Sequence, residues 1–135
     1  MSQRNAETVH RLYAASRRRD KEECVRLAAP NVELVSYLMG VEGTVYSGHA
    51  GVRRYIDDLF SAFPDWHPAV VETTEHGDHV LSEVRMAGQG ASSGLAIEQT
   101  VWQVTTFDDE GMMIGFHGYG TAAEALEAVG ARESP

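Results

Sequence analysis

Glu83, Arg85 and His117 have side chains that can move a proton or stabilise a developing charge. A carboxylate, a guanidinium and an imidazole close together are typical of acid–base catalysis. Glu83 and Arg85 alternate with less polar residues along a strand-like segment, and successive side chains of a strand point to opposite faces. Burying the less polar set leaves both charges in water, which costs less free energy than burying the charges. We therefore predict that the face of this strand that is turned toward the protein core carries Val80, Ser82, Val84 and Met86.

A shift of this strand by one residue would reverse the arrangement. Glu83 and Arg85 would then form a buried ion pair, which could be catalytic. His117 would join them if the last strand were bulged or shifted, although we expect an outward position for it. Both registers remain open at this point, and the cost of burying charge favours the first.

In the favoured register, the pocket that this strand face would help to line is largely apolar, and its polar groups are amides and hydroxyls. Gln103 points inward from the next strand, while Ser36 and Tyr13 come from the first strand and the first helix. These groups can orient a substrate by hydrogen bonding, but they cannot exchange a proton near neutral pH as carboxylates do. We predict them as the catalytic residues. The predicted substrate-binding residues are Tyr37, Trp66, Val84, Met86, Gln99 and Phe116.

Two other motifs suggest a cofactor or a metal, and neither has the required context. The glycine-rich segment 88–94 leads into another strand, whereas a dinucleotide-binding loop opens a helix. His76 and His79 flank a tight turn, but the sequence offers no distant third or fourth ligand for a structural metal. We therefore predict neither a cofactor nor a metal.

The elements that position these residues follow from hydrophobic periodicity and capping signals. Helices are predicted over Ala6–Arg18, from Asp20, over Gly48–Ala62 and from Thr121, with Pro64 stopping the third. Strands are predicted over Asn31–Leu38, Pro68–Glu75, His79–Gly88, Leu95–Phe107 and Met112–Tyr119. Helices followed by a run of strands predict an α+β fold, with helices on one face of a concave sheet and a cavity at its open end.

The bulk composition limits the classes of partner. The 135 residues fit one domain over residues 1–135, with residues 131–135 frayed. A formal net charge of -9 argues against a nucleic-acid partner, and no apolar run is long enough to span a membrane. The single cysteine, Cys24, cannot form an internal disulfide, and the N-terminus lacks the apolar core of a secretory signal. We therefore expect a cytoplasmic protein.

Several short motifs, taken in order, resemble those of one family. They are segments 46–52 and 77–80, Phe63-Pro64-Asp65-Trp66, segment 109–113, and the stretch from Tyr119 to Leu126. The chain resembles the SnoaL-like polyketide cyclase group of the nuclear transport factor 2-like superfamily, which also includes ketosteroid isomerases. This resemblance implies a cone-shaped barrel in which a curved, mixed or antiparallel sheet wraps around N-terminal helices.

The resemblance also implies where catalytic acids would lie. The base of the ketosteroid isomerases matches Ser36, their donor carboxylic acid matches Gln103, and their donor tyrosine matches Leu12, with Tyr13 one residue out of phase. The acid on the last strand of SnoaL-like cyclases matches Gly118. Because these positions carry no carboxylate, we do not expect either reaction by its usual route.

The expected function is that of a small-molecule pocket protein. It would act by hydrogen bonding and orientation on a polyketide-like or other hydrophobic metabolite that carries a carbonyl or hydroxyl. Alternatives are a non-catalytic ligand-binding or carrier module, an isomerase, cyclase or epoxide hydrolase that uses Glu83, Arg85 or His117 in the shifted register, and a protein-interaction domain. Whether the chain is an enzyme, of the isomerase or cyclase type, stays open. The outward apolar residues Trp102 and Val104 predict a homodimer through the outer sheet face.

Overall fold

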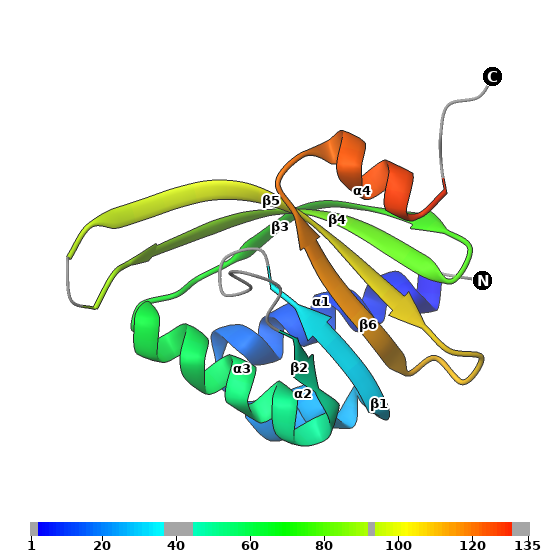
Figure 1. Ribbon diagram of the computed structural model, residues 1–135, viewed down its shortest axis with the longest axis horizontal. Coiled ribbons are helices and arrows are strands. Elements are labelled where there is room, and N and C mark those ends of the chain that lie inside the picture. The colour runs from blue at the N-terminus through cyan, green and yellow to red at the C-terminus, as the bar shows by residue number, and fades with distance from the viewer. Residues whose placement is uncertain (1–2, 37–44, 92–93, 131–135) are drawn as a thin grey trace.

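Six strands form one curved, mixed sheet (Figure 1). The computed structural model describes residues 3–36, 45–91 and 94–130. Along the chain the elements are α1 (Gln3–Arg17), α2 (Lys21–Arg26), β1 (Ala28–Val35), β2 (Tyr46–Ser47), α3 (Gly48–Ala62), β3 (Ala69–His76), β4 (His79–Gln89), β5 (Ala96–Phe107), β6 (Met113–Tyr119) and α4 (Ala122–Ala128). The strand order is β2-β1-β6-β5-β4-β3. The predicted α+β class is confirmed, but the sheet curves without closing into a barrel.

The helices lie on both faces of this sheet. Helices α1, α2 and α3 lie on one side, and α4 lies on the other (Figure 1). The main core fills the space between α1–α3 and the facing side of the sheet, with Val9, Val32, Leu59, Val80 and Val101 among its most buried members. We call this side the inner face. Strands β1 and β6 are parallel, whereas the other neighbouring strands are antiparallel.

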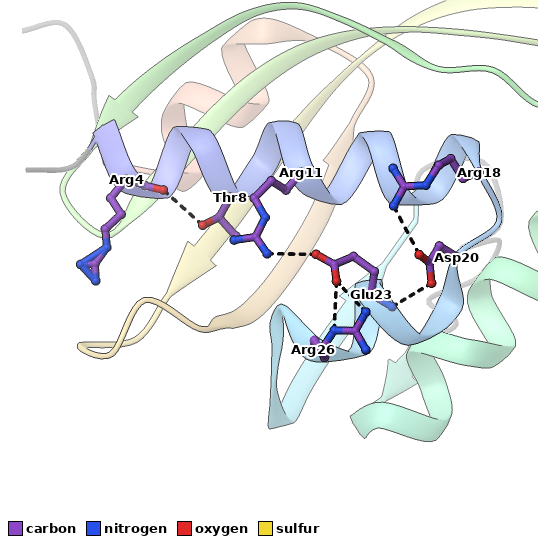
Figure 2. Close-up of polar contacts among 7 residues, drawn as sticks. All are labelled: Arg4, Thr8, Arg11, Arg18, Asp20, Glu23 and Arg26. Carbon is purple, nitrogen blue, oxygen red and sulfur yellow. Dashed lines mark hydrogen bonds and ion pairs between the residues drawn. The ribbon is translucent and has the colours of Figure 1, made fainter.

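Asp20 and Glu23 organise the join between α1 and α2 (Figure 2). The Asp20 carboxylate accepts a hydrogen bond from the Glu23 backbone N–H at 3.1 Å, which confirms the predicted helix cap. The Glu23 carboxylate pairs with Arg11 at 3.0 Å and with Arg26 at 2.8 Å. Because both arginines are exposed, water screens these ion pairs, and they contribute little to stability. Burial of Cys24, a residue of α2, therefore stabilises this helix more than its ion pairs do.

Helix α3 begins at Gly48 and ends at Ala62, as predicted. Thr121 caps α4 by accepting a hydrogen bond from the Glu124 backbone N–H at 3.2 Å, and Gly130, with φ 75°, follows the end of that helix. Strand β1 begins at Ala28 rather than at Asn31, and the predicted end of that strand lies outside the described residues. In the described ranges, no helix is long and apolar enough to span a membrane.

The pairing of β4 with β5 decides between the two registers. Ser82 pairs directly with Gln103, and Val84 pairs with Val101. These side chains are buried, whereas Arg85 is exposed and pairs with the exposed Glu98 at 3.5 Å. The favoured register is confirmed, and the shifted register is wrong. Apolar burial sets the register, because a shift by one residue would place Glu83 and Arg85 in the core.

The beginning of β6 departs from the predicted alternation. Phe107 pairs with Met113 while Thr106 pairs with Gly115, so one extra residue, Ile114, lies between the two pairs. Such a bulge changes which side chains face the core. Met113 is therefore buried in the main core, and the half-buried Ile114 lies in a groove on the outer face, although strict alternation with the buried Phe116 would place it inward.

The outer face near Val104 is covered by the chain itself. Val104 is only 5% exposed and packs in a second apolar cluster with Leu81 and Ala125, beneath α4. Trp102 and Tyr119 are half-buried at the border of this cluster. The prediction that Val104 lies open for a second subunit is therefore wrong, because the last helix occupies that position.

Candidate functional site

A narrow cavity lies between the helices and the inner face of the sheet. The volume open to water in it is about 30 Å³, which is room for about two water molecules. Helices α1 and α3 form one side, and strands β1, β4 and β6 form the other. Its lining residues are Leu12, Tyr13, Ser16, Cys24, Leu34, Val52, Tyr55, Ile56, Leu59, Trp66, Met86, Met113 and Phe116.

The described lining contains no carboxylate and no imidazole. Its ionisable groups are a thiol and two phenols. Burial raises the pKa of the Cys24 thiol to about 11, and the nearby Asp20 and Glu23 add to this shift. Burial also raises the pKa of Tyr55 to about 12 and that of Tyr13 well above its usual value. All three groups are therefore neutral near pH 7, which agrees with the predicted apolar pocket.

Tyr13 and Gln103 are buried beside the cavity and are poorly satisfied. Tyr13 is 5% exposed and Gln103 is 1% exposed. The Gln103 side chain is close enough to lower the pKa of Tyr13, although burial and Tyr55 raise it more. Even so, neither the Tyr13 hydroxyl nor Oε1 of Gln103 has a hydrogen-bond partner of normal geometry among the described residues. Only Tyr13 lines the cavity itself, so Gln103 lies behind the lining.

Ser36 lies at the end of β1 and is buried. A hydrogen bond between Ser36 and Tyr55 lowers the Tyr55 pKa, against the larger effect of burial. Tyr55 lines the cavity, and its ring packs against Phe116 with 6.4 Å between ring centroids. The sequence analysis did not identify Tyr55 as a site residue. Tyr37, the other predicted polar contact, lies outside the described residues.

The predicted binding residues fall into two groups. Trp66, Met86 and Phe116 line the cavity. Val84 is fully buried in the main core, and Gln99 is half-buried on β5, but neither is a lining residue. Thus three of the five described binding positions meet at the cavity, and the other two lie on adjacent parts of the sheet.

The residues of the alternative enzyme classes lie elsewhere. Glu83 is half-buried and Arg85 is exposed, both on the face of β4 opposite Val84. His117 is exposed and its ring stacks on Tyr119, with 4.4 Å between centroids. Partial burial lowers the pKa of His117, but this imidazole belongs to a groove on the outer face. None of these groups reaches the inner cavity.

Arginines from the end of α1 hold the loop that carries Trp66. Arg17 donates a hydrogen bond to the Pro68 carbonyl at 3.1 Å, and Arg19 donates one to the Pro64 carbonyl. The Arg19 guanidinium also lies over the Phe60 ring, 4.3 Å from its centroid. These contacts fix one wall of the cavity.

Comparisons with known proteins agree with this architecture. A family model described as a SnoaL-like domain matches residues 9–114. An NTF2-like protein of unknown function from Burkholderia pseudomallei K96243 has a TM-score of 0.77 and 23% identity, covering 96% of this chain and 98% of that chain. No curated protein matches the sequence.

Two further solved structures contain bound molecules. TerC, co-crystallised with polyporic acid, has a TM-score of 0.75 and 23% identity, covering 94% of this chain and 98% of that chain. RV0760c from Mycobacterium tuberculosis, in complex with estradiol-17beta-hemisuccinate, has a TM-score of 0.74 and 14% identity, covering 89% of this chain and 95% of that chain. At these identities the structures show a shared fold, and the family model covers most of the sequence. The chain therefore belongs to the SnoaL-like domain family.

Proposed function

We propose that this protein binds a hydrophobic, polyketide-like molecule with a carbonyl or hydroxyl group in the cavity beside Tyr13. The observation that carries the proposal is an apolar lining beside two buried atoms, the Tyr13 hydroxyl and Gln103 Oε1, that have no hydrogen-bond partner of normal geometry among the described residues. A buried polar atom without a partner costs roughly 1–3 kcal/mol. A ligand that supplies the missing hydrogen bonds recovers part of that cost and gains the burial of its apolar surface.

The ligand must enlarge the cavity when it enters. About 30 Å³ is too little for a metabolite, because typical ligand pockets hold roughly 300–1,000 Å³. Met86 and Met113 line the cavity, and methionine side chains adapt readily because they are unbranched and flexible. Rotation of these side chains would open space without moving the sheet. The solved relatives with polyporic acid and an estradiol derivative support a binding role for this fold.

Any reaction would depend on orientation and hydrogen bonding. The Tyr13 hydroxyl would donate a hydrogen bond to a ligand oxygen, and Gln103, which lies behind Tyr13, would orient that hydroxyl. Ser36 would hold Tyr55 in place through their hydrogen bond. An isomerisation or cyclisation that needs no strong protein base fits these groups. The alternative is a carrier that retains its ligand unchanged. Chemical analysis of a bound ligand after long incubation separates the two, because a carrier returns the same compound.

A substitution that fills the cavity tests the binding role. Ser16 lines the cavity from α1, so Ser16→Leu adds bulk there while keeping a good helix former. The matched control is Ser61→Leu, at an exposed position of α3. Using 2-naphthol as the probe and calorimetry as the readout, we expect Ser16→Leu to weaken binding at least tenfold and Ser61→Leu to leave it unchanged. Equal affinity in both variants would refute a site in this cavity.

Two further properties belong to this proposal. Two copies would associate through the part of the outer face that α4 leaves open, a groove lined in part by Val35, Ile114, His117 and Tyr119. Apolar and aromatic groups in one groove favour a protein contact. The buried, free thiol of Cys24 supports a reducing, cytoplasmic location.

A further inference from the structure

A solvent-accessible groove lies next to the cavity, on the side of the helices and away from the sheet. The volume open to water in it is about 380 Å³. Ile56, which is 4% exposed, lines both this groove and the inner cavity, and among the described residues no other side chain lines both. The groove is therefore the neighbouring space into which a ligand longer than the cavity can extend. Its lining residues are Arg19, Lys21, Ile56, Asp57, Phe60 and Ser61.

Arg19, in the link between α1 and α2, has a backbone conformation that glycine usually supplies. Its φ is 61°, and it is the one non-glycine residue in the described ranges with a positive φ. The Arg19 N–H donates to the Ser16 carbonyl at 3.0 Å, and the Asp20 N–H donates to the Ala15 carbonyl at 2.9 Å, which is the pattern of a Schellman motif. Glycine is the common residue at this position because any side chain there strains the backbone. The presence of an arginine indicates that its side chain has a role of its own.

The Arg19 guanidinium brings an uncompensated positive charge into the groove. It donates a hydrogen bond to the Pro64 carbonyl and lies over the Phe60 ring, and both of these partners are uncharged. In the part of the chain that the structure describes, no carboxylate forms an ion pair with Arg19. Lys21, the other cation of the groove, pairs with Asp57 at 2.8 Å. Because a guanidinium has five N–H donors, Arg19 keeps donors for a ligand.

This arrangement favours a ligand group with one negative charge. Guanidinium groups bind carboxylates through paired N–H donors. A single uncompensated guanidinium matches a monoanion better than a phosphate monoester, which carries roughly 1.5–2 negative charges at pH 7. We infer that the ligand of the inner cavity is an amphipathic carboxylic acid, whose carboxylate binds Arg19 in the groove while its apolar body lies in the cavity beyond Ile56. This inference rests on the proposed function and narrows its ligand class.

Two probes that differ only in charge test the carboxylate: 4-(2-naphthyl)butanoic acid and 4-(2-naphthyl)butanamide. They share the apolar body and the chain, and only the acid is ionised at about pH 7.5. The formal net charge of -9 would by itself favour the neutral amide. We nevertheless expect calorimetry at low ionic strength to show that the wild-type protein binds the acid about tenfold more tightly. This preference should fall at roughly 0.5 M salt, because salt screens an exposed ion pair.

Substitutions at Arg19 separate its charge from its structural contacts. Arg19→Gln should reduce the preference for the acid to less than about twofold, whereas Arg19→Lys should keep a preference of about three- to fivefold. The preference is a ratio of two affinities, so any loosening of the wall at Trp66 affects both probes and largely cancels. The matched control is Arg18→Gln, which removes the same charge from the adjacent residue. Arg18 is exposed, pairs with Asp20 at 3.3 Å and does not line the groove, so the control should keep the wild-type preference (Figure 2).

The outcomes separate this inference from the proposed function. If acid and amide bind equally and Ser16→Leu weakens both, the cavity is the binding site but the carboxylate inference is wrong. A preference for the acid that survives in Arg19→Gln, or that Arg18→Gln removes to the same extent, also overturns the inference. If Ser16→Leu leaves the affinity for the acid unchanged, the acid binds without entering the cavity, which contradicts the inference as well. If neither probe binds, both the proposed function and the inference are contradicted.

Discussion

Asp65 and Gln89 join the loop after α3 to the end of β4: Oδ1 of Asp65 accepts a hydrogen bond from the Gln89 backbone N–H at 2.8 Å. Trp66, the next residue, is 4% exposed and lines the cavity. Gly88 allows the close approach, because a Cβ at this position would lie only 3.3 Å from Cβ of Phe63. The carboxylate of Asp65 is thus a structural group that fixes one wall of the binding site.

Removing this carboxylate should loosen the wall. We expect Asp65→Ala to lower the free energy of unfolding by about 1 kcal/mol, because the Gln89 N–H loses its acceptor. Asp65→Asn should retain most of the stability, since its amide oxygen can still accept. Urea denaturation followed by tryptophan fluorescence measures both variants. Equal losses for the two substitutions would mean that the hydrogen bond has no role in stability.

The Tyr13 hydroxyl should contribute to binding rather than to folding. Because the Tyr13 hydroxyl forms no hydrogen bond of normal geometry with the described residues, Tyr13→Phe should leave the free energy of unfolding unchanged or slightly raise it. The same change should weaken binding of 2-naphthol by about three- to tenfold. Tyr119→Phe, on the outer face, is the matched control and should preserve affinity. If Tyr13→Phe bound 2-naphthol as tightly as the wild-type protein does, this hydroxyl would be excluded from the site.

Alkaline pH should destabilise the protein through Cys24. The Cys24 thiol has an ordinary pKa of 9.0, which applies to the unfolded chain, and a pKa of about 11 in the folded protein. As the pH rises, the unfolded chain therefore loses this proton before the folded protein does. Stability from this group is complete below pH 9.0 and is lost as the pH rises toward about 11. The total loss is on the order of 2 kcal/mol. Urea denaturation at several pH values should show a smaller loss for Cys24→Ala, and an identical loss in both proteins would contradict the buried thiol.

Ligand binding should be insensitive to pH near neutrality. The described cavity lining contains no carboxylate or imidazole, and its phenols and thiol have raised pKa values. The Kd of 2-naphthol should therefore change less than about twofold between roughly pH 5.5 and 8. Calorimetry over this range checks the prediction. A bell-shaped or sigmoidal profile would indicate a titrating group in the site.

Self-association should depend on the open part of the outer face. Light scattering at micromolar concentration should give about twice the subunit mass of 14.8 kDa. His117 is exposed in the outer groove, so His117→Glu should shift the protein toward the monomer by placing like charges at the contact. A single-subunit mass for the wild-type protein would exclude the proposed homodimer.

The features that the sequence predicted well have strong local or alternating signals. Helix α3 has a broad apolar face and a proline just beyond its end, so both limits were correct. The inner face of β4 followed from the cost of burying Glu83 and Arg85. Thr121 and Asp20 were recognised as caps because a side-chain oxygen and the N–H three residues later form a local pair.

The features that it missed depend on contacts between distant segments. The bulge at Ile114 appears only when β6 pairs with β5, because one extra residue must be accommodated. Val104 was expected to be accessible because the return of α4 over the outer face has no local signal. Likewise, the hydrogen bond between Ser36 and Tyr55 joins the residue that follows β1 to α3. Periodicity assigns a residue to a face but does not name the partner it meets there.

A crystal structure with bound 2-naphthol is the most direct test of the binding site. We predict that its ring system occupies the space beside Met86 and Phe116, with its hydroxyl within roughly 3.2 Å of the Tyr13 hydroxyl. A ligand bound in the outer groove beside His117, or one whose hydroxyl points to solvent, would contradict the assignment of this cavity.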